Sequence, residues 1–283
     1  MKYLKYFQKQ TDYQSFITGD TFVTPNVSFA EEENLVFYNP YEEPINPSVP
    51  NNVITYTASE KLPESDGMSA GLMTDAFNTT MVSHEFTNGV GTITFEEDVT
   101  EIRENAFFGC DTLTSINIPD SVTYIGDYAF QSCEGLTSFI IGSRVTDIGY
   151  SAFKGCSSLT SITIPDSVTY IGDYAFSSCT GLTSMVIPFS ITEIGKNVFY
   201  NCSSLTSKEI SDVSSIGAGA FSSCSNLSSI TCYSEIAPMI DRRTFTNVKE
   251  GGILRIPEES DYSSWMRTDY DYLGKYNWTI EYI

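Results

Sequence analysis

IPDSVTYIGDYAF occupies residues 118–130, and the same thirteen letters recur unchanged at residues 164–176. The offset between the two copies is 46 residues, which is twice 23. Alignment at an offset of 23 brings out further copies with the shared pattern V-T-x-I-G-x-x-A-F-x-x-C-x-x-L-T-S-x-x-I-P-x-S. A constant period of this length indicates a repeat architecture, in which each unit contacts mainly its neighbours.

Phenylalanine, leucine and cysteine each return once per unit. Six units of 22–23 residues, starting near Val99, follow one another without interruption. The phenylalanine column consists of Phe107, Phe130, Phe153, Phe176, Phe199 and Phe221. Such columns predict a continuous apolar core that runs through all six units, because equivalent residues of stacked repeats lie on top of one another.

Each unit reads as a strand followed by a turn and a short helix. In LTSINIPDS (113–121), apolar and polar residues alternate, which predicts a strand with one buried face that ends at Pro119. Asp127 then has the chemistry to cap a short helix that turns Phe130 and Cys133 toward the core.

These motifs resemble leucine-rich repeats of the BspA type, a family named for a bacterial surface adhesin. The signature A-F-x-x-C-x-x-L-T-S-I-x-I-P-x-S-V-T-x-I-G covers residues 99 to about 235. The resemblance implies an α/β repeat solenoid, a right-handed coil with a parallel β-sheet and short helices. It also implies binding to host or partner proteins rather than catalysis, so we do not expect an enzyme.

The units are not all alike. Ser121, Ser167 and Ser190 stand where many leucine-rich repeats place an Asn or Cys ladder, and Arg144 departs from that column. Lys208 takes a position that is apolar in the other units, in the unit that is one residue short. Because a buried lysine is costly, we expect an irregular backbone at that position.

The sequence divides into three predicted domains. Residues 1–90 form a β-rich N-terminal region with a linker or arm, residues 91–235 hold the repeats, and residues 236–283 form a C-terminal cap. TNGVGTITFEEDV (87–99) predicts a hairpin whose second strand starts the stack. TPNVSFAEEENLVFYNP (24–40) is a further hairpin candidate and resembles headers in proteins of gut bacteria and their phages.

Charge and composition exclude several classes of partner. The formal net charge is −21, which argues against nucleic acid because a phosphate backbone demands Lys and Arg. No apolar stretch is long enough for a membrane span. The first residues, MKYLKYFQKQTDYQ, hold lysines without a following apolar run, so we expect no secretory signal there. The sequence is also compatible with an oligomer.

Cysteine and histidine raise the question of chemistry. Six of the seven cysteines lie in register at one position of the repeat, with no C-x-x-C spacing that would suggest zinc. We expect buried free thiols, no metal and no cofactor. His84 is the single histidine, and Ser83-His84-Glu85 are neighbours in sequence, which is no indication of catalytic geometry.

Residues that vary between uniform units are the candidates for recognition. Ile140 and Val186 vary on the outer face of the expected sheet. Tyrosines form a second varying set, and tyrosine suits interfaces because it brings a large area and one polar tip. The candidate ligand-binding residues are Tyr124, Tyr128, Tyr170, Tyr174, Ile140 and Val186, with Tyr150 nearby. The alternative is that these rings only cover the turns between strand and helix.

Two functional hypotheses follow. The first is a protein- or glycan-binding adhesion module on a bacterial surface, and the second is a virion component, such as a decoration, fibre or tail protein of a phage that infects gut bacteria. Free thiols and the absence of an evident signal fit the second hypothesis, because virions assemble in the cytoplasm.

Overall fold

The computed structural model describes residues 50–65, 71–210 and 213–283. The chain divides into two units, Met1–Pro47 and Ser48–Ile283, and the second unit contains all of the described residues. The hairpin predicted at residues 24–40 lies outside the described part. The division into three domains stays a prediction.

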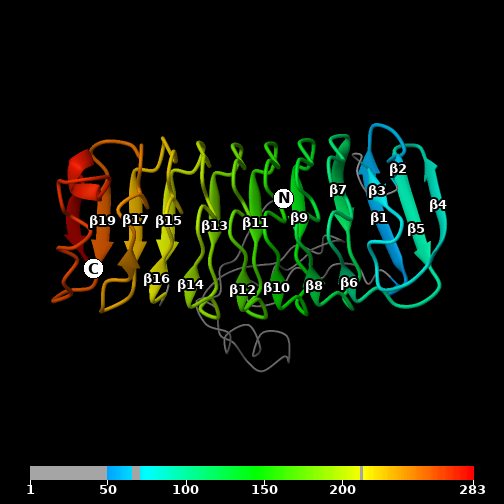
Figure 1. Ribbon diagram of the computed structural model, residues 1–283, viewed down its shortest axis with the longest axis horizontal. Coiled ribbons are helices and arrows are strands. Elements are labelled where there is room, and N and C mark those ends of the chain that lie inside the picture. Colours follow the sequence, from blue (N-terminus) through cyan, green and yellow to red (C-terminus); the bar gives the residue numbers. More distant parts are fainter. Residues whose placement is uncertain (1–49, 66–70, 211–212) are drawn as a thin grey trace, which may run out of the picture. The chain divides into compact units, whose positions relative to one another are not determined.

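The repeats stack into a solenoid whose strands form two parallel ladders, one of longer and one of shorter strands (Figure 1). In the longer ladder, seven strands lie side by side in the order β20-β19-β17-β15-β13-β11-β9. They are β9 (Ser138–Ile140), β11 (Ser161–Thr163), β13 (Ser184–Val186), β15 (Ser207–Ile210), β17 (Ser229–Cys232), β19 (Ile253–Ile256) and β20 (Thr279–Tyr282).

The second ladder has strands of two residues and is split in two. One sheet contains β6 (Glu101–Ile102), β8 (Tyr124–Ile125), β10 (Asp147–Ile148) and β12 (Tyr170–Ile171). The other contains β14 (Glu193–Ile194), β16 (Ser215–Ile216) and β18 (Met239–Ile240). Each strand pairs with the residues at the same repeat positions of the next unit, so Ile102, Ile125 and Ile148 follow one another on the buried side.

The short helices predicted in each unit are wrong. Among the described residues, the one helix is the 3-10 turn η1 (Leu273–Tyr276), which lies beyond the repeats. In the A-F-x-x-C segment, two residues of each unit adopt a left-handed backbone conformation, as Tyr128 (φ 57°) and Ser132 (φ 60°) do. A helix needs a right-handed conformation at every residue, so these two positions interrupt it.

Hydrogen bonds between coils account for this conformation. Alternate amides of the segment leave their own coil, and the N–H of Phe130 donates to the carbonyl oxygen of Ala152 in the next coil at 2.7 Å. The side chain of Asp127 accepts the N–H of Tyr150 at 2.7 Å instead of capping a helix of its own coil. Stacking therefore takes the backbone donors that a helix would have used within one unit.

The predicted core columns are confirmed. Every phenylalanine of the column is buried, and successive rings stack nearly parallel, with centroids 5.2 Å apart between Phe130 and Phe153. The seven cysteines are buried, and each column thiol from Cys133 onward donates to a phenylalanine carbonyl oxygen, as Cys156 does to Phe130 at 3.2 Å. Burial raises the pKa of the Cys156 thiol to about 12.

The N-terminal sheet is antiparallel, in the order β4-β5-β1-β7, and comprises β4 (Met81–Thr87), β5 (Val90–Phe95), β1 (Val53–Ala58) and β7 (Leu113–Asn117). β4 and β5 form a hairpin around Asn88 and Gly89, which both have positive φ, as its tight turn requires. The prediction that this hairpin starts the stack is wrong in one respect. β1, and not β5, pairs with β7 of the first repeats.

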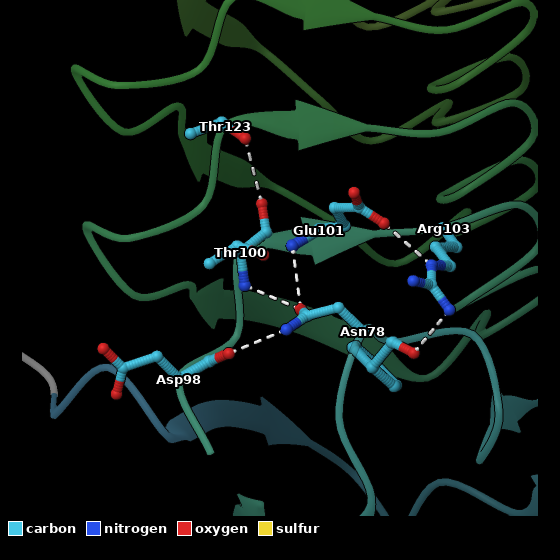
Figure 2. A network of polar contacts seen from close by, with 7 residues as sticks. Asn78, Asp98, Thr100, Glu101, Arg103 and Thr123 are labelled. Carbon is cyan, nitrogen blue, oxygen red and sulfur yellow. Dashed lines mark hydrogen bonds and ion pairs between the residues drawn. The ribbon is translucent and has the colours of Figure 1, made fainter.

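A polar clamp covers the first strand of the shorter ladder (Figure 2). The side-chain oxygen of Asn78 accepts the N–H groups of Thr100 at 2.7 Å and Glu101 at 3.1 Å, and its amide donates to the carbonyl oxygen of Asp98 at 2.8 Å. Arg103 donates to the carbonyl oxygen of Phe77 at 3.0 Å. These bonds replace the preceding coil, which would otherwise satisfy the edge of β6. The short strands β2 (Glu64–Ser65) and β3 (Leu72–Met73), which precede Asn78 in the sequence, pair in parallel with each other.

The C-terminal end is covered by aromatic side chains. Trp265 is fully buried, lies 5.4 Å from Phe245 between ring centroids, and donates its indole N–H to the carbonyl oxygen of Pro238 at 2.9 Å. Trp278 is buried and donates to the carbonyl oxygen of Lys249 at 2.7 Å. The last strand, β20, then pairs in parallel with β19.

Lys208 lies inside the core, with 2% of its surface exposed. Its ammonium group donates to the carbonyl oxygen of Met185 at 2.6 Å and lies 5.3 Å from the ring centroid of Phe199. The expected irregularity is present, because β13 and β15 share the single register pair Val186–Glu209, whereas β11 and β13 share three.

Candidate functional site

Ile140 and Val186 lie on the outer face of the seven-stranded sheet. Their exposed fractions are 41% and 63%, and Thr163 pairs with both of them from the strand between. Because the strands are parallel and in register, the three side chains form one apolar row across β9, β11 and β13. The same face becomes charged farther along, where Arg255 and Glu281 form a salt bridge of 3.0 Å.

Phe189 is an exposed apolar residue that the sequence reasoning did not single out. It follows β13 and has 74% of its surface exposed. It stands where the P-D-S turn places Asp120 and Asp166 in two other units. An aromatic residue in an aspartate position of a surface turn is a departure from the repeat that could have drawn attention to it.

Tyr124 and Tyr170 lie on the shorter ladder, and not on the sheet that carries Ile140 and Val186. Their exposed fractions are 36% and 56%. Asp147 pairs with Tyr124 on one side and with Tyr170 on the other, and Glu101 pairs with Tyr124 from β6. The outward positions of β6, β8, β10 and β12 therefore alternate between carboxylates and phenol rings.

The surroundings of Tyr124 are acidic. Its pKa is raised above the ordinary value, first by burial of part of the ring and then by nearby carboxylates. Those carboxylates belong to Asp127, Asp147, Glu101 and Glu104. A negative potential over this ring disfavours a phenolate and favours a cation close to it.

Tyr128 and Tyr174 occupy the left-handed position of the turn, with φ of 57° and 62°. Of the other four units, three fill this position with Asn105, Asn197 and Gly219, which tolerate such a φ more readily, and one fills it with Ser151 (φ 53°). A bulky residue in this conformation is uncommon, and strain of this kind is often associated with functional sites.

Tyr150 links these two residues. Its ring centroid lies 5.3 Å from that of Tyr128 and 5.5 Å from that of Tyr174, so the three rings form a continuous group on the turns. Tyr128 and Tyr124 also share Asp127 as a neighbour. Burial is the first cause that raises the pKa of both phenols, and the charge of Asp127 raises each of them further. We name the five tyrosines Tyr124, Tyr128, Tyr150, Tyr170 and Tyr174, with Asp127 and Asp147, the tyrosine face.

His84 belongs to a structural cluster in the N-terminal sheet. Its Nε2 lies 2.7 Å from the hydroxyl oxygen of the buried Tyr56, and its Nδ1 lies 3.1 Å from the Glu64 carboxylate. Burial lowers the pKa of the imidazole, so neutral His84 accepts from Tyr56 and donates to Glu64. Neither of its sequence neighbours Ser83 and Glu85 is a partner in these two bonds.

The described residues contain no group of three or more His, Cys, Asp or Glu side chains arranged to hold a metal ion. None of their helices has the length and apolar character needed to cross a membrane.

Comparisons with known proteins place this geometry in a family. The BspA type leucine rich repeat region matches residues 79–206 and 146–261 in six copies, which together span more than half of the chain. The chain belongs to the BspA type leucine rich repeat family. The comparison with curated proteins gives no match.

Solved structures of bacterial leucine-rich repeat proteins are similar to parts of this BspA type chain. A leucine-rich repeat protein from Bacteroides ovatus shares 26% identity over 62% of this chain and 50% of its own, with a TM-score of 0.43. A leucine rich cell surface protein from Faecalibacterium prausnitzii shares 27% identity over 62% of this chain and 54% of its own, also with a TM-score of 0.43. The chain thus spans about half the length of these two proteins.

A third similar structure is the T. pallidum leucine rich repeat protein. It shares 27% identity over 66% of this chain and 80% of its own, with a TM-score of 0.44.

Proposed function

We propose that this chain is a non-enzymatic binding module that holds a protein or glycan ligand on the coils between residues 117 and 190. We further propose that it acts as an adhesin at a bacterial cell surface. Membership of the BspA type family supports binding as the general activity. The tyrosine face and the apolar row of Ile140, Thr163 and Val186 are the parts of these coils that support a specific interface.

The observation that carries the proposal is the pair of exposed rings, Tyr124 and Tyr170, on either side of Asp147. A repeat protein gains no core stability from side chains that point to solvent, and uniform units would place the same small polar residue there. Exposed tyrosines next to a carboxylate combine apolar area with hydrogen-bonding groups. Residues of this type commonly dominate the energy of an interface.

The left-handed tyrosines give independent support. Tyr128 and Tyr174 hold a conformation that asparagine or glycine adopts with less strain, and three of the other four units use those residues. Packing of rings against Tyr150 stabilises the arrangement. Of the three rings, that of Tyr150 is exposed, and those of Tyr128 and Tyr174 are half-buried, which supports a ligand contact at Tyr150 first.

The test replaces Tyr124 and Tyr170 together by serine. Wild-type protein is applied to a printed glycan array and to a displayed peptide library, and dissociation constants are measured for the strongest probe of each kind. We expect the double variant to bind at least tenfold more weakly, which corresponds to about 1.4 kcal/mol. Thermal unfolding should show that both proteins are folded.

A matched control replaces Tyr233 and Tyr282, which are exposed to a similar degree at 48% and 59% but lie near the C-terminal end of the solenoid. This variant should bind as the wild type does. Equal binding by the wild type and the Tyr124/Tyr170 variant would instead mean that those rings only cover their coils. Absence of binding to every glycan and peptide would contradict the proposal as a whole.

A further inference from the structure

The shorter ladder sets a regular spacing between chemically different groups. Along it, Glu101, Tyr124, Asp147 and Tyr170 follow one another on successive strands that pair in register. Neighbouring strands lie about 4.8 Å apart, so each residue lies roughly 10 Å from the next residue of its own kind. The row is therefore a two-coil repeat of one carboxylate and one phenol ring.

The negative charge of this row is only partly compensated by the protein itself. Among the salt bridges of the described residues, the one on this row joins Arg103 to Glu101 at 2.8 Å. The carboxylate of Asp147 accepts a hydrogen bond from the Thr146 hydroxyl at 2.6 Å, and no salt bridge within the described ranges involves it. The Asp147 carboxylate therefore lies between the residues Tyr124 and Tyr170 on the neighbouring strands, and within the described ranges no salt bridge neutralises its charge.

The tyrosine face already holds one cation against a ring. The ammonium group of Lys154 lies 5.8 Å from the ring centroid of Tyr174. A cation near the face of a phenol ring gains from the electron density of the ring, and a nearby carboxylate adds to this attraction. Tyr124 and Tyr170 each provide a ring beside the carboxylate of Asp147, and no cation–ring contact within the described ranges involves either of them.

We propose that the partner of the tyrosine face is an extended polypeptide segment that carries Lys or Arg at every third residue and runs along the stack of coils. This proposal rests on the proposed binding function and names its partner class. In the extended polyproline II conformation a chain has three residues per turn and rises about 3.1 Å per residue, so every third side chain lies on the same side, roughly 9 Å from the next. This spacing is close to the two-coil repeat of roughly 10 Å along the row. Each cationic side chain then meets an equivalent pair of carboxylate and ring.

Charge favours such a peptide over a neutral glycan. A neutral sugar stacks on an exposed ring, but it leaves the carboxylates of Asp147 and its neighbours without a counter-charge. After burial of part of the ring, nearby carboxylates raise the pKa of Tyr124, so a negative potential is present at its hydroxyl group. A basic segment neutralises that potential, and it is steered toward a chain whose formal net charge is −21.

The experiment measures fluorescence anisotropy of short labelled peptides with the full chain. The probes are repeats of Lys-Ser-Gly, repeats of Lys-Gly with the same number of lysines, and repeats of Glu-Ser-Gly. We expect the wild type to bind the Lys-Ser-Gly peptide several-fold more tightly than the Lys-Gly peptide, and the Glu-Ser-Gly peptide not at all. Asp147→Asn should weaken binding of the Lys-Ser-Gly peptide by about three- to fivefold.

Asp120→Asn is the matched control, because it removes the same charge from an exposed turn outside this row. It should leave the affinity for the Lys-Ser-Gly peptide unchanged. Equal affinities for the two lysine peptides, together with equal losses in the two aspartate variants, would overturn the proposal in favour of general charge attraction. A glycan whose binding depends on Tyr124 and Tyr170, with no such dependence for lysine peptides, would overturn the partner class and leave the binding face intact.

Discussion

The coil that contains Phe176 and the coil that contains Lys208 are built from the same repeat, but they fill one inward position of the core differently. The first uses an apolar side chain and the second uses a lysine. In the first, Ile162 points inward between Phe139 and Met185 and the sheet pairs fully with its neighbours on both sides. In the second, Lys208 takes the inward position, and β15 keeps one register pair with β13. The side chains of Ile162 and Lys208 are nevertheless both buried.

The comparison teaches what a repeat core demands of each position. An apolar side chain needs only contact area, and the backbone carbonyls remain free for the ladder. A buried ammonium group needs a hydrogen-bond acceptor, and Lys208 takes the carbonyl oxygen of Met185, which belongs to the adjacent coil. One charged position is therefore accommodated by local loss of strand pairing, while the phenylalanine stack continues through Phe199 and Phe221.

The largest expected change in stability comes from a substitution in the core of the regular coil. Phe176→Ala removes a fully buried ring that stacks on Phe153 at 5.4 Å and on Phe199 at 6.1 Å. We expect a loss of about 3–5 kcal/mol in the free energy of unfolding, because a large cavity opens in a shared core. Denaturant unfolding, followed by far-UV circular dichroism and by tryptophan fluorescence, should shift together across the whole array.

Phe189→Ala provides the control, since that ring is 74% exposed and should change stability by less than about 0.5 kcal/mol. Separate transitions from the two probes, with only one of them shifted by Phe176→Ala, would contradict a continuous core.

The second largest change is expected when Lys208 of the irregular coil is replaced by an apolar residue, as the other coils have at this position. Burial lowers the pKa of Lys208 from 10.5 to about 7, and the nearby Glu209 and Cys202 oppose this shift. Between pH 7 and 10.5 the unfolded chain holds a proton that folded Lys208 has lost, so stability rises with pH in this window. Below pH 7 both states are charged and the full penalty applies, on the order of 5 kcal/mol.

Lys208→Met should therefore stabilise the protein by several kcal/mol at pH 6 and by about 1 kcal/mol at pH 9.5. Urea unfolding of both proteins at the two pH values measures the difference, and titration of other groups cancels in it. Met185 occupies the equivalent buried position one coil earlier, so methionine fits this environment. A stabilisation that does not change with pH would show that Lys208 has an ordinary pKa.

The smallest effect concerns the serine column of the regular coils. Ser167 donates its hydroxyl to the carbonyl oxygen of Val145 at 2.7 Å, and Ser190 repeats this bond to Val168. Ser167→Ala should cost about 1 kcal/mol, since a carbonyl loses its partner between two coils. Chemical unfolding of this variant is compared with Ser184→Ala, an exposed serine of β13 that should change stability little. Equal stability of the two variants would mean that the column adds nothing to stacking.

Much of the fold could be predicted because the core positions can be recognised in the repeat as columns of identical apolar residues. The columns of Phe130, Cys133 and Leu136 recur at a constant offset, and residues that recur in this way must share an environment. The first neighbour of the repeats could not be predicted in the same manner. VITYTA (53–58) alternates as any half-buried strand does, and nothing in that pattern identifies β7 as its partner.

The candidate site stays a prediction. The tyrosines departed from the repeat and could be found as variation; Tyr124, Tyr150 and Tyr170 are exposed, and Tyr128 and Tyr174 are half-buried. The sequence did not indicate that Asp147 lies between Tyr124 and Tyr170, because this follows from the register of β8, β10 and β12. The separation of the tyrosines from Ile140 and Val186 onto different ladders is likewise a result of the coil geometry.

The sequence by itself determined that this protein is a stack of equivalent units with one shared apolar core, because periodic burial is encoded residue by residue. Only the tertiary structure decided that the A-F-x-x-C segment forms turns rather than a helix. The reason is a competition for backbone donors: the N–H of Phe130 has one hydrogen bond to give, and the next coil offers the carbonyl oxygen of Ala152. A single unit examined alone contains no such acceptor, so its helical pattern is overruled only when the units stack.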